Sequence, residues 1–388
     1  MSVTEESRAA TSSAEIALST PADRRSDIEA KHQRITALLR DKGCDGFLVL
    51  RPENFAWLTS GSPPRGVIDL DAQPALFFSQ EGRWLLCSNT DTQRIFDEEI
   101  DGLGLQLKEW PWHWGRAPLL ADVLQVQGKK FACDQPFDQC QPLGAELARL
   151  RRTLSPYEIA CYRALGETLS HALEATGRTV NRDETEREVA GQVAHRLLRH
   201  GAQPVQIAVA ANGRSRLYRQ TAYTATALKD ICVLSATARK YGLCVRSSRT
   251  ISFGEPDEKV RKEHEAACKV SATYVASSWP DSVPRAILES GQRIYQLVNA
   301  DAEFYAAPQG HIIGRIPVEQ NLTPQLEELL QANWAVCWYA SVGAAVSCDT
   351  VIITEDGART ITTSDRWPGK RIRVHGAEFM RPDILVRE

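Results

Sequence analysis

Apolar and polar positions alternate in short blocks along the first part of the chain. Residues 27–43 place Ile28, Ile35 and Leu39 at helical spacing and end at Gly43, which predicts a helix. Apolar runs bounded by polar turns predict strands at residues 46–50, 76–79, 84–87 and 130–133, with a further helix at 119–126. This alternation of helices and strands indicates an α/β domain over residues 27–150.

A second domain begins where a strong helix start follows residue 151. Ser155 can cap a helix, Pro156 suits its first turn, and Glu158 completes a capping box. Further helices are predicted over residues 185–200, 257–277 and 284–296, and strands at 205–210, 231–246, 334–339, 349–354 and 358–363. The second domain is therefore expected to occupy residues 151–388.

Composition and charge narrow the class of protein. The 388 residues are 43% hydrophobic and 24% charged, which is typical of a globular chain long enough for two domains. A net charge of -3 provides no basic surface for nucleic acid or an anionic membrane, and no apolar run of ~18 residues suggests a membrane span. We therefore expect neither nucleic acid nor a membrane as a partner.

The beginning of the chain and its cysteines indicate where the protein resides. Residues 1–26 are rich in Ser, Thr, Ala and charge and lack the apolar core of a secretory signal, which predicts a disordered tail. The ten cysteines form no Cys-x-x-Cys pair. We expect them to be reduced, buried thiols of a cytoplasmic protein, with no zinc site.

Residues 232–254 are the most informative passage of the sequence. They predict a strand, a turn at Gly242 and a second strand that leaves through Ser248, Arg249 and Thr250. This passage resembles the metal-binding hairpin of the creatinase, prolidase and aminopeptidase P family, and residues 54–61 resemble a segment of that family's amino-terminal domain. The resemblance implies an α+β pita-bread domain preceded by an α/β creatinase-like amino-terminal domain, with Arg249 paired internally.

The resemblance also assigns positions to the family's dinuclear metal centre. The two aspartates fall on Ser235 and Arg246, the histidine on His311, and the two glutamates on Tyr339 and Cys348. A catalytic histidine of several members falls on Tyr218. A divalent cation requires negatively charged oxygen ligands, whereas Arg246 brings a permanent positive charge. We therefore expect no dimetal centre and no cofactor.

The leading hypothesis is that the altered cleft accepts an anion. A buried guanidinium needs an anionic partner, and for Arg246 this is either Asp349 within the protein or the carboxylate of a small amino-acid-like or peptide-like ligand. Tyr339, Ser235 and Cys348 would line the ligand site beside it, although each also has a purely structural interpretation. Hydrolysis of a C–N bond without metal would use His311 and Tyr218 as catalytic groups.

Two other functions stay open at this point. The first is a catalytically inactive pseudopeptidase that acts as a protein-interaction module. The second is a divergent Xaa-Pro aminopeptidase or dipeptidase that keeps metal ligands elsewhere. Under any of these, the resemblance implies a homodimer.

A tryptophan-rich segment lies outside this comparison. Trp110, Trp112 and Trp114 occupy alternate positions, which predicts an extended segment with three indoles on one face. Packing within the protein, a protein interface and ligand stacking all remain open for it.

Overall fold

The structure is a computed structural model that describes residues 21–363 and 366–388. Residues 1–20 of the predicted tail lie outside the described residues, whereas residues 21–26 begin the helix α2 (Pro21–Lys42). The chain divides into two compact units. The N-terminal unit comprises the described residues up to Arg151 with Ser155–Cys161 and Tyr241–Leu243, and the C-terminal unit comprises Arg152–Leu154, Tyr162–Lys240 and the described residues from Cys244 onward.

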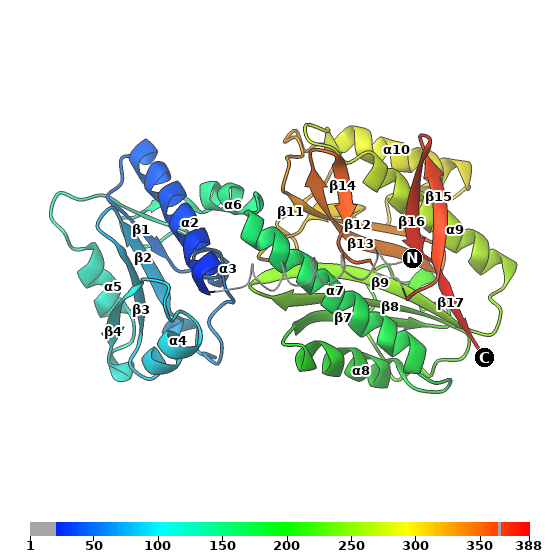
Figure 1. Cartoon of the computed structure of the whole chain (residues 1–388), viewed down its shortest axis with the longest axis horizontal. Helices are drawn as coiled ribbons and strands as arrows, with labels where there is room; N and C mark the ends of the chain where they lie inside the picture. The colour runs from blue at the N-terminus through cyan, green and yellow to red at the C-terminus, as the bar shows by residue number, and fades with distance from the viewer. Residues whose placement is uncertain (1–20, 364–365) are drawn as a thin grey trace, which may run out of the picture. The chain divides into compact units, whose positions relative to one another are not determined.

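The N-terminal unit is a mixed six-stranded sheet with helices on both faces (Figure 1). Its strand order is β4-β3-β2-β1-β5-β6, in which β1–β2 and β2–β3 are antiparallel and the remaining pairs are parallel. The strands are β1 (Gly46–Val49), β2 (Ala75–Ser79), β3 (Arg83–Ser88), β4 (Gln106–Trp110), β5 (Phe131–Cys133) and β6 (Gln141–Pro142). The other helices are α3 (Pro52–Leu58), α4 (Thr92–Glu98), α5 (Ala117–Leu124) and α6 (Gly144–Arg152), with a short 3-10 turn η1 (Leu70–Ala72).

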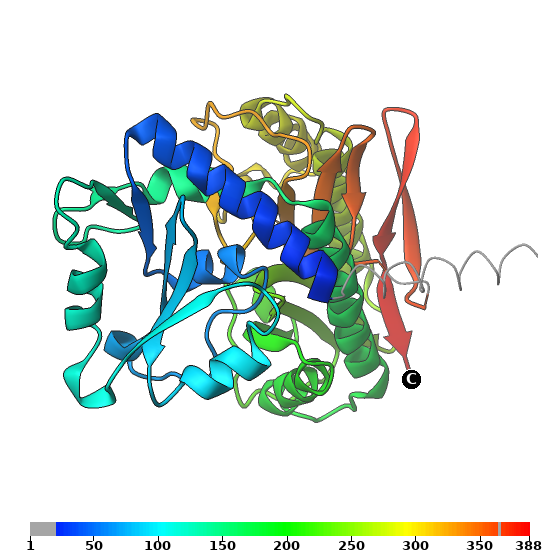
Figure 2. The ribbon, with the colours of Figure 1, turned by 60° about the vertical axis from the view of Figure 1, so that its left-hand side comes forward.

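Alternation along the strands fills both faces of this sheet. Phe47 of β1 and Phe78 of β2 pack with Ile28 and Ile35 of α2, which crosses the sheet in Figure 2. The intervening residues Leu48 and Phe77 belong to a second cluster on the other face, together with Leu120 and Val123 of α5. A strand buried on both faces explains why the run at residues 46–50 is continuously apolar.

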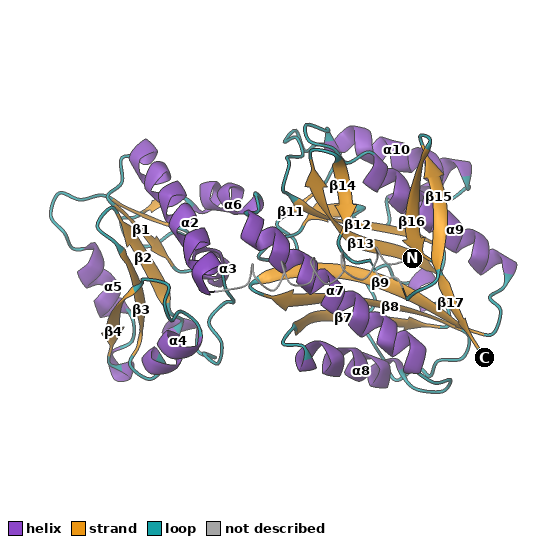
Figure 3. Cartoon of the chain, viewed as in Figure 1, coloured by secondary structure: helices purple, strands orange, loops and turns teal. Residues whose placement is uncertain are grey.

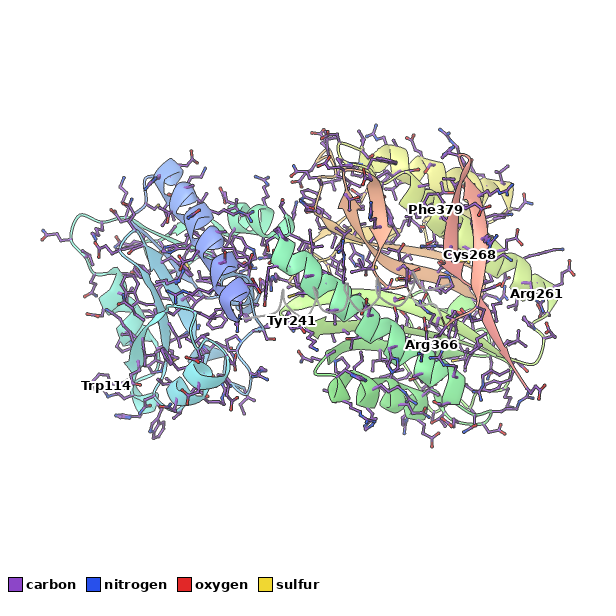
Figure 4. All side chains as sticks on the ribbon, viewed as in Figure 1. Trp114, Tyr241, Arg261, Cys268, Arg366 and Phe379 are labelled. Atoms are coloured by element: carbon purple, nitrogen blue, oxygen red, sulfur yellow. The ribbon has the colours of Figure 1, made fainter. Side chains whose placement is uncertain are left out.

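The tryptophan segment differs from its prediction. Trp110 ends β4 and is 2% exposed, whereas Trp112 and Trp114 lie on the 3-10 turn η2 (Trp112–Trp114) and are 68% and 63% exposed (Figure 4). The backbone N–H of Trp114 donates to the Pro111 carbonyl at 2.9 Å and closes this turn. The extended segment is therefore wrong, and the three indoles share no face.

The helix α7 (Pro156–Thr179) begins as its sequence predicts. The Glu158 N–H donates to Ser155 Oγ at 3.2 Å, and the Ser155 N–H donates to a Glu158 carboxylate oxygen at 2.9 Å. This is the reciprocal pair of a capping box.

The C-terminal unit combines a four-stranded sheet, a five-stranded sheet and a two-stranded sheet, with long helices on the outer faces of the two larger ones (Figure 3). The four-stranded sheet has the order β17-β9-β8-β7, from β7 (Gln203–Ala211), β8 (Ile231–Lys240), β9 (Leu243–Phe253) and β17 (Ile384–Arg387). The five-stranded sheet has the order β11-β10-β12-β13-β14, from β10 (Gly310–Ile312), β11 (Gln320–Asn321), β12 (Ala335–Val342), β13 (Ala345–Thr354) and β14 (Gly357–Thr360). The helices are α7, α8 (Glu186–Arg199), α9 (Glu258–Ala276), α10 (Pro284–Leu297) and α11 (Asp301–Phe304).

The largest core of this unit lies under the five-stranded sheet. Residues of α9 and α10, such as Val270 and Ile287, pack against Val336 and Trp338 of β12. A separate hairpin of β15 (Gly369–Val374) and β16 (Ala377–Pro382) covers another part of α9, where Cys268 and Phe379 share a small cluster (Figure 4).

The strands β9 and β13 belong to different sheets and are joined by side-chain hydroxyls. Thr350 Oγ1 accepts from the Arg246 N–H at 3.0 Å and donates to the Arg246 carbonyl at 2.8 Å. Ser248 Oγ accepts from the Cys348 N–H at 3.0 Å. We call this junction, residues 246–248 of β9 and 348–350 of β13, the β9–β13 seam.

Arg249 follows the seam and is paired internally, as the resemblance implied. It is 2% exposed, and its Nε donates to the Glu174 carboxylate at 2.9 Å. Its Nη atoms donate to Ser247 Oγ, the Ser248 carbonyl and the Thr362 carbonyl. The guanidinium therefore ties α7, β9 and the segment after β14 together.

Arg249→Met is expected to lower the free energy of unfolding by about 3–5 kcal/mol, because it leaves the Glu174 carboxylate buried without its main cation. Arg178 reaches that carboxylate only at 3.9 Å. Urea denaturation of the full chain measures the effect. Arg199→Met, on the exposed side of α8, is the matched control and should change the free energy of unfolding by less than about 0.5 kcal/mol. A loss below about 1 kcal/mol for Arg249→Met would contradict the argument.

Candidate functional site

The hairpin of β8 and β9 brings Ser235 and Arg246 to one cavity. Its turn uses Tyr241 and Gly242, whose φ angles of 55° and 68° lie in the left-handed region. Ser235, Arg246, Tyr218 and Tyr339, four of the predicted site residues, line this cavity, whose volume is about 20 Å³. A space of that size holds about one water molecule or a group of similar size.

Arg246 is half-buried, and its guanidinium lies over the Tyr339 ring, 5.1 Å from the ring centroid. Within residues 21–363 and 366–388, no carboxylate forms an ion pair or hydrogen bond with this side chain. Burial alone would lower the pKa of Arg246, but the ionisable Cys348, Cys337 and Tyr339 beside it raise the pKa above its ordinary value. The group therefore carries its positive charge at the cavity.

Asp349 is not the internal partner that the sequence suggested for Arg246. Its Oδ1 accepts from Ser247 Oγ at 3.0 Å and from Thr362 Oγ1 at 2.7 Å, and its Oδ2 lies 3.3 Å from Arg381 Nη1. Successive residues of a strand face opposite sides of the sheet. Asp349 therefore faces away from the side that carries Cys348.

Tyr339 lies opposite Cys348 in the antiparallel register of β12 and β13. It is 9% exposed, and its hydroxyl donates to the Arg219 carbonyl at 2.9 Å. The phenol is thus oriented along the wall of the cavity, and its ring supports the guanidinium of Arg246.

Tyr218 is 54% exposed and lies at the rim of the cavity. The Arg214 guanidinium lies 5.7 Å from the centroid of its ring. We define residues 214–219 as the rim segment. It begins with the 3-10 turn η3 (Arg214–Arg216) and forms three ion pairs. These pairs are Arg214 with Glu186, Arg216 with Glu263 and Arg219 with Glu303.

Cys348 is 1% exposed, and its Sγ lies 3.6 Å from Cys337 Sγ on the neighbouring strand. The hydrogen bond from Cys348, with the nearby His311 and Arg246, lowers the pKa of the Cys337 thiol well below its usual range. The same hydrogen bond and burial raise the pKa of Cys348 well above its usual range. The sequence analysis missed Cys337, although its spacing from Tyr339 places both on one face of β12.

His311 lies on β10 and is 6% exposed. It is the register partner of Cys337 on the side of β12 away from β13. The structure therefore connects His311 to Arg246 and Tyr339 through the thiols rather than through direct contact with the cavity. The catalytic and binding roles assigned to the six predicted residues stay predictions.

The residues at these positions do not fit a divalent cation. Among the residues that the structure describes, no group of three or more His, Cys, Asp and Glu side chains is arranged to hold a metal ion. The Arg246 guanidinium, placed where the resemblance expects an aspartate, would repel a cation.

The two units and the position of the cavity define a pita-bread protein with a creatinase-like amino-terminal domain. Residues 160–355 match the family model of metallopeptidase family M24, and the chain belongs to this family. No curated protein sequence is significantly similar to it. The predicted family and fold class are thereby confirmed.

Solved structures agree on the fold. X-Pro aminopeptidase from Thermotoga maritima MSB8 has a TM-score of 0.73 at 17% identity, over 92% of this chain and 99% of that one. Prolidase from Pyrococcus horikoshii OT3 has a TM-score of 0.74 at 17% identity, over 87% and 99%. The N-terminal domain of FACT complex subunit SPT16 from chickpea has a TM-score of 0.61 at 14% identity, over 87% and 95%. Within the described part of the chain, no helix is long and apolar enough to cross a membrane.

Arg246→Met is expected to change the free energy of unfolding by less than about 1 kcal/mol. The substitution removes a half-buried charge that has no carboxylate partner, so the relief of its desolvation offsets the lost contact with the Tyr339 ring. Urea denaturation alongside Arg249→Met provides the comparison. A loss of about 3 kcal/mol or more, which is typical of a broken buried ion pair, would reveal an internal counter-ion.

Proposed function

We propose that this protein binds the carboxylate group of a small amino-acid-like or peptide-like ligand at Arg246, without a metal centre. The observation that carries the proposal is a half-buried guanidinium that faces a cavity and has no carboxylate partner among the described residues. Such a group gains most from a charge-assisted, bidentate contact with a planar anion. Ser235 lies at the same cavity and supplies a hydroxyl group as a further hydrogen-bond donor.

The size of the cavity limits which part of a ligand enters it. About 20 Å³ is far below the several hundred Å³ of a site that encloses a whole drug-sized molecule. A carboxylate group fits this space, and the rest of the ligand would leave past the exposed ring of Tyr218. We therefore favour ligands with an unhindered terminal carboxylate.

Binding is better supported than hydrolysis. A general base must come within hydrogen-bond reach of the proton that it removes. His311 lies beside Cys337, on the side of β12 away from β13, whereas Tyr218 is the proposed catalytic group that lines the cavity. Cleavage of a C–N bond without metal would therefore depend on Tyr218, or on a ligand that moves the thiols aside and so reaches His311. We rank hydrolysis second to binding.

The protein-interaction module keeps support of its own. The solved domain from chickpea with the same fold is a part of a multi-subunit complex by its description. A pita-bread domain whose metal positions are altered could serve in the same way. The metallohydrolase alternative is weakened by the unsuitable residues at the ligand positions.

Acetate, glycine and short peptides with a free carboxylate are expected to raise the thermal unfolding temperature of the full chain, while acetamide and glycinamide are not. Arg246→Met should weaken carboxylate binding by about 10- to 100-fold in calorimetry, in line with ~1.5–3 kcal/mol for a hydrogen bond to a charged group. Arg199→Met is the control and should bind like the unaltered chain.

Equal binding of carboxylates and amides, or unchanged affinity in Arg246→Met, would overturn the assignment. If none of the probes bind and a stable protein partner co-purifies with both the unaltered chain and Arg246→Met, the interaction module becomes the better description.

A further inference from the structure

Cys337 and Cys348 form a close pair of thiols on neighbouring antiparallel strands. Their sulfur atoms are 3.6 Å apart, and the two side chains are 0% and 1% exposed. In the register of β12 and β13, Cys337 pairs with Thr350 and Cys348 with Tyr339, so the cysteines are diagonal neighbours. To form a bond of about 2.05 Å, the two sulfurs must approach each other and the strands that carry them must move closer.

We propose that Cys337 and Cys348 are a redox-active dithiol that closes to a disulfide when a peroxide oxidises it. With hydrogen peroxide, the Cys337 sulfur attacks one oxygen, the O–O bond breaks, and the departing oxygen leaves as water. Cys337 is then a sulfenic acid. The Cys348 sulfur attacks the Cys337 sulfur, the S–O bond breaks, and the second oxygen leaves as water with the remaining proton. Two thiols and one peroxide thus give one disulfide and two water molecules.

The surroundings assign the two cysteines different parts in this reaction. His311 lies beside Cys337 on β10, and the Arg246 guanidinium acts on both sulfurs. A thiolate is the nucleophile in such reactions, and nearby imidazole and guanidinium groups favour it. Cys337 is therefore the attacking group, and Cys348 is the resolving group.

Other buried cysteines of the chain lack this setting. Burial raises the pKa of Cys87 to about 11 and the pKa values of Cys133 and Cys268 to about 12. A thiol with a raised pKa is a poor nucleophile at neutral pH. Their sulfur–sulfur distance of 3.6 Å distinguishes Cys337 and Cys348 from these thiols.

Neither cysteine lines the cavity, so a peroxide that enters it must pass Tyr339 and Arg246 to reach the thiols. Tyr339, which lines the cavity, is the register partner of Cys348, and Arg246 lies at the cavity and acts electrostatically on the same thiol. Space for about one small molecule matches a peroxide rather than a larger oxidant. The proposal therefore commits to small peroxides.

The bond is expected to be reversible rather than structural. Diagonal neighbours in an antiparallel pair have Cα atoms roughly 7–8 Å apart, whereas disulfides span about 4.4–6.8 Å. Closing the bond must draw the two strands together, and strained disulfides are reduced more easily. A dithiol reductant should therefore reopen it.

Oxidation would also change the charge at the cavity. The disulfide removes the two ionisable thiols that raise the pKa of Arg246, which leaves the guanidinium more available to an external anion. This consequence rests on the carboxylate-binding proposal, whereas the disulfide itself does not.

The test uses the full chain with Cys140→Ser, since Cys140 is partly exposed and would react on its own. Hydrogen peroxide at a small molar excess is expected to remove two free thiols, and peptide mass spectrometry should find Cys337 linked to Cys348. Dithiothreitol should restore both thiols. Adding Cys348→Ser should stop the reaction at a sulfenic acid on Cys337, which dimedone traps.

A matched control removes two other buried cysteines, Cys232 and Cys244, by double substitution to Ser; it should leave the linked peptide unchanged. Oxidation at other cysteines while Cys337 and Cys348 stay free would overturn the proposal. So would direct conversion of Cys337 to a sulfinic acid in the chain that still holds Cys348.

Calorimetry with acetate then compares the reduced and oxidised chains. Tighter binding after oxidation supports the coupling to Arg246, and equal affinity contradicts the coupling. Absence of acetate binding to either form counts against the carboxylate proposal, while the mass spectrometry result continues to decide the disulfide.

Discussion

The β9–β13 seam is the constraint on which the cavity depends. Thr350 donates to and accepts from the backbone of Arg246, and Ser248 accepts from the backbone of Cys348. Side-chain hydroxyl groups thus take the place of backbone hydrogen bonds between the two strands, and Thr350, Ser248 and Cys348 are buried. Because the seam fixes β9 against β13, Arg246, Cys348 and the register partner Tyr339 reach the same place although they come from different sheets.

Arg246 differs from the neighbouring arginines because no carboxylate of the described residues pairs with its guanidinium. Arg249 is paired with Glu174, and the arginines of the rim segment are each paired with a glutamate. Arg246 instead rests on an aromatic ring and two thiols. Arg246 therefore lies at the cavity without a carboxylate partner among the described residues, and this is the basis on which we propose that it accepts an external anion.

Local signals predicted the parts of the fold that depend on neighbouring residues. The capping box of Ser155 and Glu158 and the β8–β9 hairpin followed from such signals, whereas the internal pairing of Arg249 followed from the family resemblance. The prediction of an extended tryptophan segment was wrong because a turn forms after Pro111 despite the strand-like spacing. The prediction that Asp349 pairs with Arg246 was wrong because it relied on the nearness of Asp349 to Cys348 in sequence. Successive residues of a strand point to opposite faces, so Asp349 lies on the other face.

Cys337 shows the limit of such reasoning most clearly. Its environment is set by Cys348 and His311, which lie on different strands, and the register that joins them is a property of the folded sheet. The sequence shows the spacing of Cys337 and Tyr339, but it does not show that the Cys348 sulfur on the neighbouring strand lies beside them. The pita-bread fold could be recognised from motifs, whereas the contacts at its altered positions could be known only from the folded structure.

The backbone of the rim segment is fixed by ion pairs, whereas the Tyr218 ring that it carries at the cavity opening is exposed. Three glutamates fix the backbone around Tyr218, yet its ring projects into solvent. Replacement of that ring would alter the opening while the cation at the base and the scaffold around it stay in place. If the proposed ligand site is real, single changes at residue 218 would thus alter its selectivity with little effect on the stability of the fold.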